Sequence, residues 1–113
     1  MAIPDPLEDD LATIGGIEGL RSLFPDDETL EVFSGRFKAL ADPMRLKILI
    51  LLAPGPLCVC VIRETLGIAD SRLSYHLNVL KKAGLIAGEP QGTWIIYSLT
   101  PAAGRALSFL EGE

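Results

Sequence analysis

Residues 58–99 read CVCVIRETLGIADSRLSYHLNVLKKAGLIAGEPQGTWIIYSL, and this stretch decides the fold. Leu73, Leu77 and Leu80 follow one another at i, i+4 and i+7, which is the spacing of a single buried helix face. The opposite side carries short or polar groups of the kind that meet base edges and phosphates. These groups are Ser71, Arg72, Ser74, Tyr75, His76 and Asn78. The pattern predicts a recognition helix with one face in the core and one face toward DNA.

A short turn and a hairpin flank this helix. Residues 66–68 (Leu-Gly-Ile) are typical of the glycine-containing corner of a helix-turn-helix. Gly84 is placed to end the helix. Residues 85–89 and 93–99 then predict two strands joined at Pro90-Gln91-Gly92. We therefore expect a mainly α protein with a small β-hairpin, a winged helix-turn-helix that binds DNA.

Helices are predicted on both sides of this stretch, which brings the expected total to about five. Asp26 or Asp27 is placed to cap a helix over residues 28–40. Asp42 and Pro43 form a helix-starting pair for residues 43–53, with Leu46, Leu49, Ile50 and Leu52 as its expected core. The cysteine-bearing helix follows and ends at Leu66. A last helix runs over residues 101–110.

The first and last of these helices carry more apolar surface than one small domain needs to bury. The expected interface residues are Leu30, Phe33, Phe37, Leu107 and Leu110. Pairing these residues across a two-fold axis predicts a homodimer. A two-fold protein suits a pseudo-palindromic double-stranded DNA operator with half-sites one helical turn apart.

Length and composition fit one globular domain. The chain has 113 residues, 49% of them hydrophobic. The first residues are acidic and lack the apolar core of a signal peptide, and the longest apolar run, residues 48–53, is too short to span a membrane. We expect a cytoplasmic protein without membrane contact. Residues 1–27 predict an acidic, mobile arm with a helical turn near residues 17–23, and residues 28–113 the DNA-binding and dimerisation domain.

Charge is unevenly distributed along the chain. The total is −5, but residues 1–35 carry −8, residues 36–82 carry +5 and residues 83–113 carry −2. A basic helical segment within an otherwise acidic protein is the electrostatic pattern of phosphate binding. A merely solvated charged surface is the other interpretation, and the helix pattern favours DNA.

Three segments resemble the ArsR/SmtB family of metal-responsive repressors. Residues 37–49 (FKALADPMRLKIL) are similar to the family's helix-loop-helix entry, and residues 57–60 (LCVC) to the start of its metal box. Residues 71–86 resemble its recognition helix and exit to the wing. The resemblance covers roughly residues 30–100. It implies a dimeric repressor that an inducer releases from its operator.

The resemblance places DNA-facing positions along the recognition helix, at Asp70, Ser71, Arg72, Ser74 and Tyr75. Serine hydroxyls can donate to phosphate, an arginine can fork onto guanine, and a tyrosine can donate or stack. Asp70 also fits the N-cap of this helix. The further expected contacts are His76, Lys81, Lys82 and Gln91. For His76 the alternative is a hydrogen-bonded structural residue, and the wing tip around Gln91 lacks lysine and arginine.

Cys58 and Cys60 are the candidate sensor. Thiolates select soft ions such as arsenite, cadmium, lead or zinc, and a helix N-terminus favours the thiolate. In a regular helix these two residues lie roughly 200° apart, so the first turn must unwind for both to reach one ion. Arg63 stands where arsenic-responsive relatives have a third thiolate, so the remaining ligands are water or an arm carboxylate.

Three alternatives stay open for the thiols and for the function. The cysteines are a metal(loid) sensor, a redox pair, or small core residues in a constitutive regulator. No catalytic triad, phosphate-binding glycine loop or three-ligand metal cluster occurs in the sequence, so no enzyme and no required cofactor are expected. A winged helix that binds only other proteins is the remaining alternative.

Overall fold

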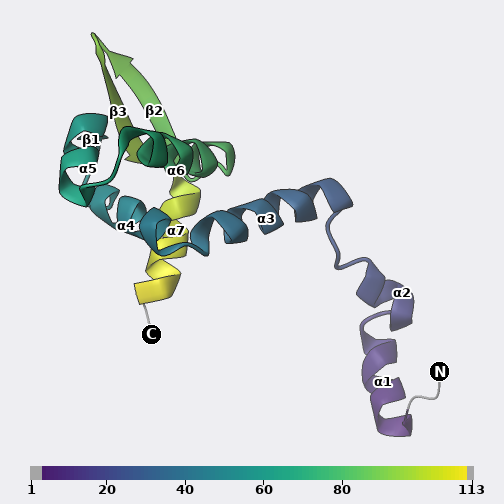
Figure 1. Cartoon of the computed structure of the whole chain (residues 1–113). Coiled ribbons are helices and arrows are strands. Elements are labelled where there is room, and N and C mark those ends of the chain that lie inside the picture. Colours follow the sequence, from purple (N-terminus) through teal and green to yellow (C-terminus); the bar gives the residue numbers. More distant parts are fainter. Residues whose placement is uncertain (1–3, 112–113) are drawn as a thin grey trace. The chain divides into compact units, whose positions relative to one another are not determined.

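The computed structural model describes residues 4–111, and Figure 1 shows the elements in chain order. The chain divides into two compact units, Met1–Glu31 and Val32–Glu113. The elements are α1 (Asp5–Thr13), α2 (Gly16–Arg21), α3 (Asp27–Leu40), α4 (Pro43–Leu52), β1 (Leu57–Cys58), α5 (Val59–Leu66), α6 (Asp70–Lys82), β2 (Ile86–Gln91), β3 (Trp94–Leu99) and α7 (Pro101–Glu111).

The first unit contains α1, α2 and the first turn of α3. The sequence predicts only a helical turn near residues 17–23, whereas the structure has two helices. Pro4 and Pro6 stand at the start of α1, where proline is tolerated, and Gly15 separates α1 from α2. Neither α1 nor α2 has a buried residue. The predicted domain boundary at residue 27 stays a prediction, as does the mobility of the arm.

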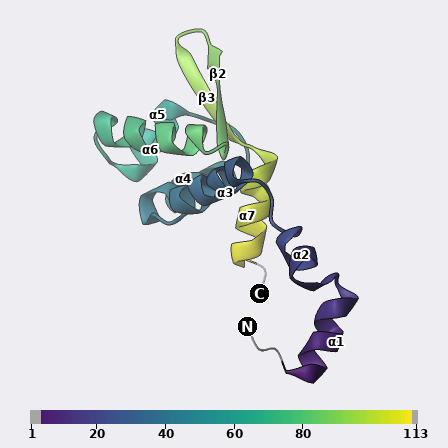
Figure 2. The ribbon, with the colours of Figure 1, turned by 90° about the vertical axis from the view of Figure 1, so that its right-hand side faces the viewer.

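The second unit is the predicted winged helix-turn-helix. Helices α5 and α6 form its helix-turn-helix, and Figure 2 shows the ribbon of β2 and β3 extending away from the helices. The turn between α5 and α6 depends on Gly67, whose φ of 63° is a left-handed conformation that glycine adopts without strain. The core is one apolar cluster contributed by every helix of this unit and by the sheet. Its members are Ala39, Ile48, Leu49, Leu52, Ile62, Leu73, Leu77, Leu80, Leu85, Ile86, Tyr97, Ala103 and Leu107.

One expectation about the core and one about the dimer interface are wrong. Ile50 is 57% exposed and Ile48 is fully buried instead, because the side of α4 that meets the core is set by its neighbours and the almost uniformly apolar helix gives no pattern to tell its faces apart. Leu107, expected at a dimer interface, is only 6% exposed and belongs to the core of its own chain.

The wing is part of a three-stranded antiparallel sheet of order β1-β3-β2, not of a two-stranded ribbon alone. The added strand β1 pairs Cys58 with Ile96. Strand β2 continues through Pro90, which was expected in the turn, and pairs it with Ile95. Proline is tolerated there because β2 is an edge strand. The turn is therefore Gly92-Thr93.

Predicted helix ends are confirmed at three places. Asp26 accepts a hydrogen bond from the Thr29 backbone N–H (2.8 Å) at the start of α3, and the carboxylate of Asp42 accepts one from the Arg45 backbone N–H (2.9 Å) at the start of α4. Helix α6 ends at Lys82, just before Gly84 with its left-handed φ of 74°, and the following Leu85 N–H donates back to the Leu80 carbonyl. These ends fix both the length of the recognition helix and the corner between α3 and α4.

Replacing Gly88 with alanine is expected to destabilise the wing. A Cβ at this position of β2 would lie 2.8 Å from Cε1 of Tyr97, whose buried ring crosses the strand at its paired position. Overpacking of this kind costs about 1–3 kcal/mol of unfolding free energy, which thermal denaturation would detect. Gly35→Ala is the matched control, because a Cβ there meets nothing within 4 Å and alanine favours a helix. Equal melting temperatures for the two variants would contradict the packing argument.

Asp42 gives the fold a predicted acid sensitivity. The hydrogen bond from the Arg45 backbone N–H holds the pKa of the Asp42 carboxyl below its ordinary 3.8. The stabilisation is therefore present above the unfolded-state pKa and is lost as pH falls through the folded-state pKa, below roughly pH 4. Asp42→Ala should cost about 1 kcal/mol in urea unfolding at pH 7 and less at pH 3. Asp42→Asn should keep the cap without its acid dependence. Identical acid dependence in Asp42→Asn and the unchanged protein would refute this assignment.

Candidate nucleic-acid interface and cysteine pair

The outer face of α6 carries the predicted DNA contacts. Leu73, Leu77 and Leu80 lie in the core, as predicted, so the opposite face is turned to solvent. The exposed residues on it, which we call the α6 face, are Ser71, Arg72, Ser74, Tyr75, Asn78, Lys81 and Lys82. Hydroxyl, amide, guanidinium and ammonium groups thus share one surface, and the exposed carboxylate of Asp70 lies at the start of the same helix. Such a surface offers donors to phosphates and to base edges.

A groove of about 730 Å³ runs beside this face, between α5, α6 and β3. Ser71, Ser74, Tyr75 and Lys81 line it from α6, and Ile95 and Tyr97 from β3. Tyr75 is 62% exposed, so its phenol is free to donate or stack. The groove places the predicted helix contacts and the base of the wing along one continuous surface.

Asp70 does not cap α6 as predicted. Ala69 is the N-cap residue and makes no side-chain cap, while Asp70 begins the helix itself. Its carboxylate accepts from Arg63 Nη1 at 3.2 Å, across the turn of the helix-turn-helix. This exposed ion pair links α5 to α6 across the turn, while the DNA contact expected at Asp70 stays a prediction. Arg63 is a residue of this site that the sequence did not identify. The signal that the sequence offered for Arg63 was its position one helical turn after Cys60.

His76 does not belong to the α6 face. It is 7% exposed, and its Nδ1 lies 3.2 Å from Nη1 of Arg45. The prediction of a DNA contact at this residue is wrong, because its position between Leu73 and Leu80 turns the ring toward α4. The alternative of a hydrogen-bonded structural histidine is the one found.

The wing tip is exposed and carries Gln91 at the end of β2, opposite Trp94. Trp94 is 54% exposed and Ile95 42%, and neither was identified from the sequence. Glu89 is the charged residue of these two strands. A wing of this composition offers amide and apolar groups rather than cations on its surface.

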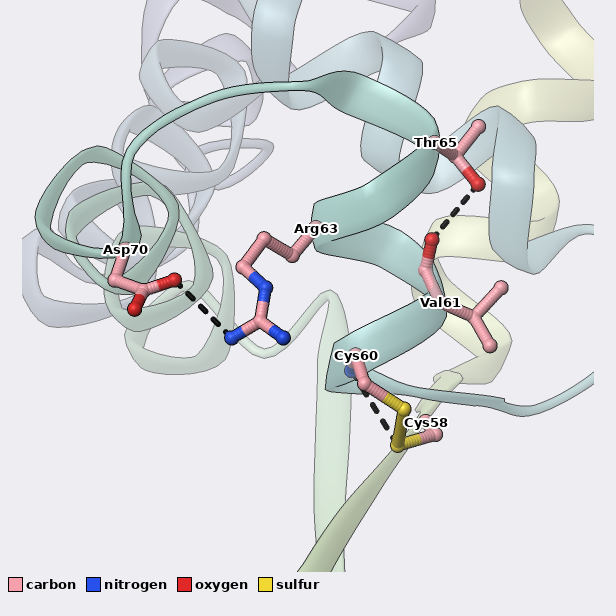
Figure 3. Close-up of a disulfide and its surroundings, with 6 residues drawn as sticks. All are labelled: Cys58, Cys60, Val61, Arg63, Thr65 and Asp70. Carbon is pink, nitrogen blue, oxygen red and sulfur yellow. Dashed lines mark hydrogen bonds and ion pairs between the residues drawn. A yellow bond between two sulfur atoms is a disulfide. The ribbon is translucent and has the colours of Figure 1, made fainter.

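Cys58 and Cys60 are joined by a disulfide at the start of α5, with their Cα atoms 5.3 Å apart (Figure 3). The expected unwinding of a helical turn is unnecessary, because Cys58 lies outside the helix, in β1, with an extended ψ of 144°. Its sulfur also accepts from the Cys60 backbone N–H at 3.3 Å and so caps α5. The pair is half-buried and belongs to two elements at once, since β1 is bonded to the wing strand β3.

The surroundings of the pair limit the metal chemistry it can support. Among residues 4–111, no group of three or more histidine, cysteine or carboxylate side chains is placed to hold a metal ion. The described residues therefore do not form the closed four-ligand arrangement typical of structural zinc. When reduced, the two sulfurs would be soft donors for a metal ion. In the same described part of the chain, no helix is both long and apolar enough to cross a membrane.

Comparison with known proteins agrees with this geometry. Residues 42–87, which span α4 to the start of β2, match the family described as "Bacterial regulatory protein, arsR family". The chain is 45% identical over 73 residues to the arsenical resistance operon repressor of Bacillus subtilis, covering 64% of this chain and 70% of that protein. It is 40% identical over 86 residues to the HTH-type transcriptional regulator NmtR of Mycobacterium tuberculosis, covering 74% and 72%.

One solved structure is similar to this chain in fold as well as in sequence. The homodimeric winged helix-turn-helix DNA-binding domain of Mb0332 from Mycobacterium bovis superposes with a TM-score of 0.67 at 31% identity, over 76% of this chain and 82% of that one. These three relatives are named as a repressor, a regulator and a DNA-binding domain, as expected for relatives of a regulatory protein. From the α6 face, the wing and these matches together, the chain belongs to the arsR family of DNA-binding transcription regulators.

Proposed function

We propose that this chain is a homodimeric cytoplasmic repressor that binds a double-stranded DNA operator through the α6 face and is released by thiol chemistry at Cys58 and Cys60. The observation that carries the proposal is the position of the pair. Cys58 directly precedes α5, the first helix of the helix-turn-helix, and lies on strand β1, which is bonded to the wing strand β3. A change at the sulfurs therefore acts on both elements that would touch DNA.

The contacts on DNA divide into base readout and phosphate binding. Arg72 is assigned to a guanine edge, because its guanidinium can donate two parallel hydrogen bonds there. Ser71, Ser74 and Tyr75 are assigned to phosphates and neighbouring base edges. Lys81 and Lys82 provide sequence-independent attraction near the end of the helix. Gln91 extends the contact through the wing.

Dimer formation is proposed through α3 and α7. Their side chains within the second unit line an apolar groove of about 710 Å³, and its walls include Phe33, Phe37, Phe109 and Leu110. Phe37 is 70% exposed and Phe109 82%, a large apolar area for a free surface. Leu30, which lies near the start of α3 and is 42% exposed, is proposed as a further interface residue. The homodimeric state named for the Mycobacterium bovis domain supports a second copy of this chain as the partner.

Phe37→Glu is expected to turn the dimer into a monomer. Two carboxylates of like charge, one from each subunit, would be forced into an apolar interface. Sedimentation equilibrium would report the mass of one chain in place of two. Val61→Glu adds the same charge at an exposed position of α5 outside the groove and should leave the mass at two chains. A dimer that survives Phe37→Glu, or an unchanged protein that is monomeric, would exclude this interface.

Arsenite or another soft metal ion is the proposed inducer class. The reduced sulfurs of Cys58 and Cys60 would provide two soft donors at the N-terminus of α5, where the helix dipole favours thiolates. Water or a carboxylate from the acidic arm would complete the ligands. The name of the Bacillus subtilis relative, an arsenical resistance operon repressor, favours arsenite within this class.

Oxidation of the pair is the second candidate signal, because the two sulfurs lie next to each other. One thiolate would attack a peroxide, which leaves as hydroxide, and become a sulfenic acid. The second thiol would then displace water from that sulfur to form the disulfide. Two electrons pass to the peroxide in the process. The operator would then respond to oxidants instead of, or in addition to, a metal ion.

A gel-shift assay with the duplex upstream of the protein's own gene tests the proposal. Protein reduced with a phosphine and then desalted should shift this duplex. Addition of arsenite, cadmium, lead, zinc or hydrogen peroxide in separate lanes should identify the signal that releases it. Release by none of them would make the chain a constitutive regulator. The absence of any shift at low salt would favour a winged helix that binds only proteins.

A further inference from the structure

One buried polar side chain fastens the recognition helix to the rest of the domain. Within residues 4–111, His76 is the buried polar residue, and it lies in the middle of α6 among leucines. Its Nδ1 is 3.2 Å from Nη1 of Arg45 and 3.9 Å from Oδ2 of Asp42. Both partners belong to the corner between α3 and α4. This contact is the polar link between that corner and the middle of α6.

The Arg45 guanidinium makes hydrogen bonds to three acceptors at once. Its Nε donates to the Ala39 carbonyl at 2.8 Å, and its Nη2 to the Lys38 carbonyl at 3.3 Å. Both carbonyls lie in the last turn of α3, and the Lys38 carbonyl also accepts from the Ala41 backbone N–H at 3.3 Å. The third donor, Nη1, faces His76. Because a guanidinium is planar and its donors are fixed in direction, the end of α3 determines where the acceptor on α6 must lie.

The protonation of the histidine follows from its partner. A guanidinium only donates, so Nδ1 of His76 must accept, and the ring proton is on Nε2. The Asp42 carboxylate already accepts from the Arg45 backbone N–H and stands beyond hydrogen-bond distance of the ring. The ring thus acts as one directional acceptor in an otherwise apolar contact.

The apolar contacts of α6 do not by themselves set the rotation of the helix about its axis. Leu73, Leu77 and Leu80 resist separation from the core, but apolar burial does not depend on angle, so small rotations of the helix change it little. A hydrogen bond weakens steeply when its angle is lost. His76 adjoins Tyr75 of the α6 face, and their rings make an edge contact with centroids 5.3 Å apart. Rotation of α6 about its axis would therefore break the Arg45–His76 hydrogen bond and shift the α6 face at the same time.

We propose that the hydrogen bond from Arg45 to His76 sets the rotation of α6 about its axis, which makes His76 a positioning residue for sequence readout. The inference rests on the proposed binding of DNA by the α6 face. Loss of the bond should leave attraction to phosphates intact, because that depends on charge and not on angle. It should lower discrimination between sequences, because bidentate base contacts tolerate little misalignment.

The test compares His76→Asn with His76→Gln. The Oδ1 of asparagine can take the place of Nδ1, whereas the extra methylene of glutamine moves its oxygen away from that place. Fluorescence anisotropy would measure binding to the duplex upstream of the protein's own gene and to a scrambled duplex of equal length. The asparagine variant should keep the affinity ratio of the unchanged protein. The glutamine variant should lose about tenfold in that ratio, with its affinity for the scrambled duplex within about twofold.

Arg45→Lys tests the other end of the bond. An ammonium keeps the charge but cannot reach three separate acceptors in fixed directions, so the same loss of discrimination is expected. Thermal unfolding would show that each variant is folded at the assay temperature, and Arg45→Lys carries the test if the histidine variants are not. Equal ratios for the asparagine and glutamine variants, or an unchanged ratio for Arg45→Lys, would overturn the inference. Failure of the unchanged protein to bind either duplex would instead overturn the proposed function.

Discussion

Arg72→Ala is expected to weaken binding to the operator by at least about 30-fold while it changes binding to a scrambled duplex far less. A bidentate arginine–guanine pair contributes about 1–3 kcal/mol of discrimination, and a homodimer loses two such pairs, about 2–6 kcal/mol in all. Arg72 is exposed on α6, so its removal leaves no cavity and no buried group without a partner. Titration of both duplexes at one fixed salt concentration would give the ratio of the two affinities.

Lys81→Ala is the control for this prediction. Lys81 is exposed near the end of the same helix, and its replacement also removes one positive charge. A phosphate contact carries no sequence information, so both duplexes should lose affinity in equal proportion. The salt dependence of binding should also become shallower, by roughly one unit of slope for each phosphate that the variant no longer neutralises. Equal losses on both duplexes for Arg72→Ala would show that Arg72 binds a phosphate and not a base.

Serine substitution of either cysteine is expected to abolish release by the inducer while DNA binding persists. The unchanged, reduced protein should lose about 5- to 150-fold in operator affinity on addition of arsenite, the usual range of coupling between two sites. Cys58→Ser and Cys60→Ser each leave one sulfur, which can neither bridge a soft ion nor close a disulfide. Both variants should bind the operator and remain bound. Operator affinity with and without arsenite, and with and without peroxide, would be measured for all three proteins.

The pattern of losses separates the two signals. Release by arsenite alone supports metal(loid) sensing, and release by peroxide alone supports the redox pair. Val61→Ser is the matched control, because it introduces a hydroxyl next to the pair on α5 and leaves both sulfurs in place. If the cysteine variants are released as readily as the unchanged protein, the sensor lies elsewhere in the chain.

The sequence predicts most of the fold because its periodicities are local. The leucines of α6 recur at helical spacing, and Pro43 and Gly84 stand where helices begin and end. The α6 face follows directly, since burying one side of a helix exposes the other. Helix α4 shows the limit of this reasoning. It is apolar on nearly every side, and only its neighbours decide that Ile48 is buried and Ile50 exposed.

The parts that were wrong or missed depend on contacts between residues far apart in the chain. Cys58 belongs to a strand because Ile96, thirty-eight positions later, pairs with it. His76 turns inward, where Arg45 supplies a half-buried donor from another helix. Asp70 pairs with Arg63 across a turn instead of capping α6. In each case the residue type is compatible with several roles, and its spatial neighbour selects one.

Salt dependence of duplex binding is the most direct test of the central claim, that the α6 face of a dimer binds operator DNA. The association constant for the upstream and the scrambled duplex would be measured over a series of salt concentrations. We predict a linear fall of the logarithm of the constant with the logarithm of salt concentration for both duplexes, with tighter binding to the upstream duplex throughout. No measurable binding to either duplex at low salt, or a binding constant that does not change with salt, would contradict the claim.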